Sequence, residues 1–153
     1  MEEHQGEYQI KHNVTLTITS LLSILFTSFH HADDVVRRMA PGRFSNLVPV
    51  FFLLVWLYGT LALAGRRSGY TIILVVSFLA SGLPVVHMRG SGLVGGDIAK
   101  SSGAFFFVWT LIALDVTALF SVILSARGLW SLRRGKSRQS NNPNMERPVE
   151  PRR

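Results

Sequence analysis

The chain has 153 residues, a formal net charge of +7 and no cysteine. Its length allows one domain at most, and the absence of cysteine excludes a disulfide framework and a thiolate metal site. Most of the cations flank long apolar runs, so we expect them to meet membrane surfaces and we expect no nucleic acid partner. This distribution is typical of an integral membrane protein.

Residues 1–12 form a polar, acidic segment without the basic start of a secretory signal, so we expect no cleavable signal. The first apolar run, residues 13–31, begins with a strand-like alternation but is too long for an ordinary strand, which favours a membrane helix. Helical periodicity places its largest apolar side chains on a face that should contact lipid: Ile18, Leu21, Leu22, Leu25 and Phe29. The opposite arc should face the bundle interior, and it carries Thr19, Ser20, Ser23, Thr27, His30 and His31.

The second apolar run, residues 46–64, carries no charge and is close to the roughly 20 residues that a helix needs to cross the hydrocarbon core. Two arginines close it, and the short connection at residues 65–69 predicts that the second and third runs are antiparallel neighbours. The third run, residues 70–88, contains Gly82 and Pro84 near its far end. These two residues predict a kink in the third helix.

The fourth apolar run, residues 104–126, opens with aromatic side chains that suit a membrane interface. Residues 133–153 are rich in Arg, Ser, Asn and Pro and lack the apolar residues of a core, so we expect a disordered basic tail. The membrane domain is then expected to comprise residues 13–132. The predicted fold is all-α, a bundle of four transmembrane helices.

The Lys and Arg residues near the ends of the four runs predict the orientation of the bundle. Four spans place both termini on one side, which collects the larger set of cations: Lys11, Arg66, Arg67, Arg127, Arg133, Arg134, Lys136 and Arg138. The other side would hold Arg37, Arg38, Arg43, Arg89 and Lys100. Because cytoplasmic ends carry the excess of Lys and Arg, we expect cytoplasmic termini in a plasma (inner) membrane, with anionic lipid headgroups as partners.

Histidines and acids near the opposite membrane face form one candidate site, which comprises His30, His31, His87, Asp33 and Asp34. Imidazole and carboxylate groups are ligands of zinc, iron and copper, and two histidines from different helices can hold a haem. The alternative is that these histidines are interfacial residues held by hydrogen bonds. Adjacent histidines on a helix point about 100° apart, and both carboxylates precede arginines at ion-pair spacing. We therefore expect no resident cofactor, with a metal or a haem as the alternative.

Asp115 lies near the middle of the fourth run, at a depth where no span contains Lys, Arg or His. A carboxyl group at mid-bilayer costs about 2.5–3.5 kcal/mol on insertion scales, so it is a functional candidate by default. It could hydrogen-bond another helix, or it could transfer protons in a small-solute or proton-coupled transporter. Thr110, Thr117 and Ser121 lie across the helix from it, which leaves no continuous polar pathway and favours the structural role.

The stretch from about Phe26 to Arg134 resembles small uncharacterised four-helix membrane proteins of bacteria in its general pattern of apolar runs. This resemblance implies the four-helix fold and the membrane location, and it transfers no active residue. No nucleophile paired with a base, phosphate loop or ligand signature stands out in the sequence. We therefore expect a non-enzymatic interaction partner or membrane-complex subunit, with a homo-oligomer as one possible form.

Overall fold

The computed structural model describes residues 2–37, 47–88, 100 and 103–140, and every regular element within these ranges is helical. In chain order the elements are α1 (Glu2–Val36), α2 (Leu47–Leu61), α3 (Arg67–Ala80), α4 (Leu83–Met88) and α5 (Ala104–Ser140). Three helical stretches are long and apolar enough to cross a membrane, namely Gly6–Val36, Arg67–Val85 and Ala104–Arg134. For this part of the chain, the predicted all-α class is confirmed, and three helical stretches have the length and apolar character of membrane spans where four spans were predicted.

Helix α2 is shorter than the span predicted at residues 46–64. It has 15 residues, which is about 22 Å at 1.5 Å per residue, against a hydrocarbon core of about 30 Å. The chain turns at residues 62–65, and the Arg66 N–H donates to the Leu63 carbonyl there. The charged pair after the turn favours water over hydrocarbon, so the apolar helix ends before it.

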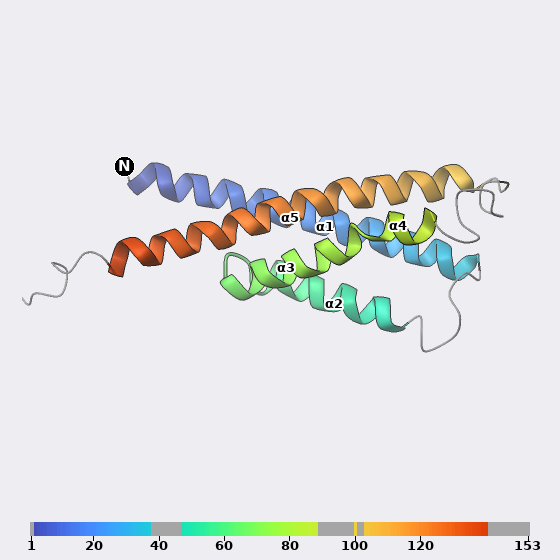
Figure 1. The fold of residues 1–153 in the computed structure, drawn as a ribbon, viewed down its shortest axis with the longest axis horizontal. Coiled ribbons are helices and arrows are strands. Elements are labelled where there is room, and N and C mark those ends of the chain that lie inside the picture. Colours follow the sequence, from blue (N-terminus) through green and yellow to red (C-terminus); the bar gives the residue numbers. More distant parts are fainter. Residues whose placement is uncertain (1, 38–46, 89–99, 101–102, 141–153) are drawn as a thin grey trace, which may run out of the picture.

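Successive long helices run in opposite directions, as the short connection at residues 65–69 predicts for α2 and α3. Figure 1 shows α1 and α5 crossing side by side, with the α2–α3 hairpin packed against them. The start of α1 and the end of α5 lie at the same end of the bundle, and the turn of the hairpin points toward it (Figure 1). We call this end, which carries Lys11, Arg66, Arg67, Arg127, Arg133 and Arg134, the basic end.

Small polar side chains line the contacts between helices, as the pattern of α1 predicts. Ser20 and Ser23 are fully buried, whereas all five side chains of the predicted lipid-facing set are exposed. Ser20 Oγ lies 2.7 Å from Thr60 Oγ1 of α2, and Thr60 itself donates to the Trp56 carbonyl, so Ser20 is the donor across the helices. Close packing and hydrogen bonds of this kind are what hold helices together in a membrane, where lipid tails are as apolar as leucine.

The kink predicted at Gly82 and Pro84 is a break that separates α3 from α4. Pro84 has no N–H to continue the hydrogen-bond ladder. The Gly82 N–H donates to the Leu79 carbonyl at 3.1 Å, one position short of the α-helical partner. The Ser81 hydroxyl donates to the Phe78 carbonyl at 2.8 Å, which satisfies the acceptor that Gly82 leaves free.

Helices α1 and α5 both continue beyond their apolar runs. Helix α1 begins at Glu2, so the polar segment at residues 1–12 is helical from its second residue, and α5 continues to Ser140, into the tail expected at residues 133–153. Adding turns to an existing helix avoids the cost of nucleation, and the Leu, Arg, Lys and Gln residues in these extensions are good helix formers. The two extensions stand next to each other at the basic end.

Candidate functional site

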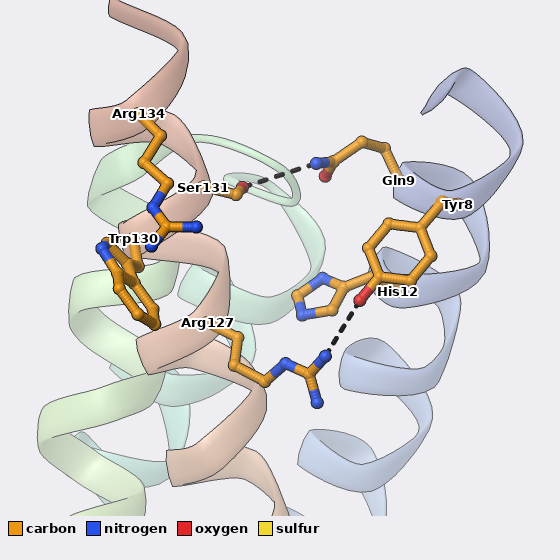
Figure 2. A pocket seen from close by; sticks show the side chains of 7 residues that line it. All are labelled: Tyr8, Gln9, His12, Arg127, Trp130, Ser131 and Arg134. Carbon is orange, nitrogen blue, oxygen red and sulfur yellow. Dashed lines mark hydrogen bonds between the residues drawn. The ribbon is translucent and has the colours of Figure 1, made fainter. Parts of the chain in front are cut away.

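The extensions of α1 and α5 line an open pocket of about 440 Å³ at the basic end. Figure 2 shows its lining side chains, which are Tyr8, Gln9 and His12 from α1 and Arg127, Trp130, Ser131 and Arg134 from α5. Within each helix these residues are spaced so that they share one face. The pocket therefore exists because both helices continue past their apolar runs.

Two hydrogen bonds connect the helices across the pocket (Figure 2). Arg127 Nη2 donates to the Tyr8 hydroxyl oxygen at 3.1 Å, and Gln9 Nε2 donates to Ser131 Oγ at 3.4 Å. Both contacts are exposed, so water competes with them and their net contribution to stability is small. They orient the side chains of the pocket, and breaking them costs little free energy.

Two guanidinium groups give the pocket positive charge. The Arg134 guanidinium stacks on the indole of Trp130, with Cζ 4.1 Å from the ring centroid, and this cation–π contact orients it. In the part of the chain that the structure describes, neither Arg127 nor Arg134 pairs with a carboxylate. Glu7 of α1 pairs instead with Lys11, at 2.6 Å. The positive charge of the pocket is thus available to an anion.

His12 forms the inner wall of the pocket. Its side chain is only 9% exposed, and neither ring nitrogen has a hydrogen-bond partner among the described residues. The ring lies between Tyr8, with centroids 6.4 Å apart, and Tyr70 of α3, with centroids 6.2 Å apart. An unpartnered buried imidazole is costly, and an imidazole has both hydrogen-bond donor and acceptor capacity.

The inner wall lies at the level where the apolar runs begin and end. The Tyr70 hydroxyl donates to Asn13 Oδ1, and the Tyr70 ring packs against Gly128. Asn13 opens the apolar run of α1, and Gly128 follows the cation that closes the run of α5. The pocket therefore lies where the apolar runs of α1 and α5 meet their polar extensions.

The structure places four of the five predicted site residues at the opposite end of α1: His30, His31, Asp33 and Asp34. His30 is 2% exposed, its Nε2 lies 3.9 Å from Asp34 Oδ2, and its ring centroid is 4.7 Å from that of Phe107. Asp33 Oδ2 accepts a hydrogen bond from Arg37 Nε at 2.7 Å, as their spacing predicts.

The described part of the chain does not test the alternative of a metal or haem site at His30, His31 and His87. Helix α4 contains His87, but its side chain lies outside the described residues, and His31 is partly exposed. Within the described ranges no group of three or more His, Asp or Glu side chains is placed to hold a metal ion. A metal or haem site that includes His87 stays a prediction.

Asp115 is half-buried on one flank of α5, midway along its apolar run. Among the described residues it has no hydrogen bond or ion pair, so the expected bond to another helix of the same chain is not seen. The nearby hydroxyls are occupied within α5: Thr110 donates to the Phe107 carbonyl and Thr117 to the Ala113 carbonyl. These hydroxyls do not form a polar path toward Asp115.

Sequence reasoning missed the pocket because its α1 residues were assigned to the polar segment at residues 1–12, while its α5 residues were divided between the end of the membrane domain and the tail that begins at residue 133. A signal was present: Tyr8 and His12 are four positions apart, and Arg127, Trp130 and Arg134 continue the helical spacing of the fourth run. Both patterns indicate that polar and aromatic side chains share a helical face outside the apolar runs. Comparison with known proteins found no match to the chain among family models, curated proteins or solved structures.

Proposed function

We propose that this protein is a non-enzymatic integral membrane protein that binds the phosphate of an anionic lipid headgroup in the pocket between α1 and α5. The observation that carries this proposal is the presence of Arg127 and Arg134 beside a pocket at the ends of two apolar runs, without carboxylate partners in the described chain. Guanidinium groups match the charge and the geometry of phosphate oxygens. Trp130 suits the headgroup level of a bilayer, and the surrounding cations attract anionic lipid.

Substitution of both pocket arginines tests the proposal. R127Q/R134Q should weaken binding of a spin-labelled anionic phospholipid about tenfold, because two charge-assisted hydrogen bonds are lost at a partly solvated site. The measurement is the fraction of motionally restricted label around the purified full chain in zwitterionic nanodiscs, by electron paramagnetic resonance. A spin-labelled zwitterionic lipid should show little difference between wild type and variant.

The matched control is R66Q/R67Q, which removes the same charge from the same end of the bundle but outside the pocket. It should retain anionic lipid binding within about twofold, since exposed charges are screened at physiological salt. Equal losses in the two variants would mean that the whole basic end attracts lipid without a site. Full competition by millimolar inorganic phosphate would point to a soluble anion as the ligand.

We further propose that α2 also crosses the membrane, which gives four spans with both termini in the cytoplasm of a plasma (inner) membrane. The turn after α2 brings Arg66 and Arg67 to the basic end, where Lys11 and Arg127 also lie. A short helix of this kind is accommodated by local thinning of the bilayer. The excess of cations at the basic end supports its cytoplasmic placement.

Reporter fusions test this orientation. A reporter that is active only in the cytoplasm should be active when fused after Lys136 and inactive when inserted within residues 90–100. A reporter that is active only outside the cytoplasm should give the opposite pattern. An outward signal from the fusion after Lys136 would contradict the proposed topology.

Two other functions stay predictions. Small-solute or proton-coupled transport would use Asp115, and metal or haem binding would use His30, His31 and His87. No contact among the described residues favours either one, whereas the pocket at the basic end combines volume, charge and depth. We therefore place headgroup binding first.

A further inference from the structure

Asp115 poses a physical problem that the described chain does not solve. It is the one charged residue in the run at residues 104–126, and it lies about halfway along that run. Polar groups at this depth have no water to bond, so they persist where another group meets them. None of the described residues hydrogen-bonds or ion-pairs with Asp115. Even Ser77 of α3, whose buried hydroxyl lacks a partner, does not reach it.

The position of Asp115 on α5 indicates where a partner would approach. One side of the residue borders the buried face of α5, which includes Leu114 and Ala118. The other side borders Ile112, which is 54% exposed, and Leu119, which is 46% exposed. These two residues lie one helical turn before and after Asp115 and share its flank. The carboxyl group therefore lies on an edge of the bundle that another helix can contact.

We propose that this flank of α5 is a homodimer interface, in which Asp115 of one chain pairs with Asp115 of a second copy. Two copies in one membrane have the same orientation, so a two-fold axis along the membrane normal brings identical residues together at identical depth. A neutral carboxylic acid both donates and accepts a hydrogen bond, so two such groups satisfy each other without any additional partner. The dimer goes beyond headgroup binding and does not depend on it.

Disulfide cross-linking tests the interface without interference, because the natural chain has no cysteine. Single variants Ile112→Cys and Leu119→Cys, in native membranes with a copper oxidant, should form dimers of twice the chain mass. The matched control is Phe120→Cys, which is 56% exposed at similar depth but lies about 140° around the helix from Asp115. It should cross-link at least about five times less, because its face points away from the axis.

Two substitutions at Asp115, each made in the Leu119→Cys chain, distinguish the proposed pairing of Asp115 from other causes of cross-linking. Asp115→Leu should lower dimer formation about tenfold, since it removes the hydrogen bonds that polar groups form between membrane helices. Asp115→Asn should retain the dimer, because an amide also donates and accepts. Thermal unfolding of each purified variant checks that the fold is intact.

The proposal is overturned if Phe120→Cys cross-links as well as Leu119→Cys, or if Asp115→Leu leaves the dimer unchanged. It is also overturned if Asp115→Asn abolishes the dimer as fully as Asp115→Leu, which would indicate an ionised carboxylate with a cationic partner. Cross-linked products that contain only another protein would likewise assign the flank to a different partner. Headgroup binding at the basic end is measured separately and would survive each of these results.

Discussion

Gly69→Ala is expected to destabilise the protein by about 3 kcal/mol, near the upper end for overpacking a close contact. A Cβ atom at Gly69 would overlap the carbonyl oxygen of Leu63 and lie 3.0 Å from the Gly59 carbonyl oxygen, and both atoms belong to backbone that a rotamer change does not move. The α2–α3 hairpin would have to open to admit the methyl group. The measurement is the free energy of unfolding of the purified chain in mixed micelles, by titration with a denaturing detergent.

The control for this prediction is Gly6→Ala in α1, where an added Cβ atom meets nothing within 4 Å. Alanine is favoured over glycine in a helix by about 1 kcal/mol, so Gly6→Ala should leave stability unchanged or raise it. The helix preference for alanine also acts at Gly69, so a net loss of stability there would have to outweigh it. Equal effects of the two substitutions would show that the hairpin is not closely packed at Gly69.

Gly128→Ala is expected to cost about 2 kcal/mol and to separate three helices at the inner wall of the pocket. An added Cβ atom would lie 2.5 Å from Cε1 and 2.7 Å from Cζ of Tyr70. The Tyr70 ring is 3% exposed, and its hydroxyl donates to Asn13 of α1. The ring therefore has no space to move without losing that bond. The same detergent titration measures the loss.

A second substitution shows whether the Tyr70 ring is the cause. Tyr70→Leu alone should also destabilise, because it removes the hydrogen bond to Asn13. The double variant with Gly128→Ala should be more stable than the sum of the two single effects predicts, by about 1 kcal/mol or more, because residues in contact couple. Additive effects would mean that the ring and Gly128 do not share one packing contact.

The interior of the bundle follows closely from the sequence. The side chains of α1 alternate in type with the period of a helix. The structure buries Ser20, Ser23 and His30 while it exposes the five residues of the predicted lipid-facing set. The break at Gly82 and Pro84 could also be predicted from the sequence, because proline lacks a backbone N–H donor at any position. Such features depend on residues within a few turns of each other, so a single sequence contains them.

The pocket and the length of α2 did not follow from the sequence. Composition assigned residues 1–12 and 133–153 to polar ends, yet a helix that starts inside a membrane can continue outside it at little cost. Tyr8 and Arg127 are separated by 119 positions, and their proximity depends on how α1 and α5 cross. Asp115 was readable as an unusual residue, but only the packed structure shows that the described chain leaves it unpartnered.

The pairing of the first helix with the last has a consequence for biosynthesis. Helix α1 leaves the ribosome before α5, and the Arg127 side of the pocket is made only after α2, α3 and α4 have been synthesised. A chain cut short before residue 127 carries Tyr8 and His12 but no guanidinium opposite them. A ligand that binds only the completed arrangement stabilises that arrangement by mass action. The proposed lipid binding would thus distinguish chains that contain both α1 and α5 from shorter ones during membrane assembly.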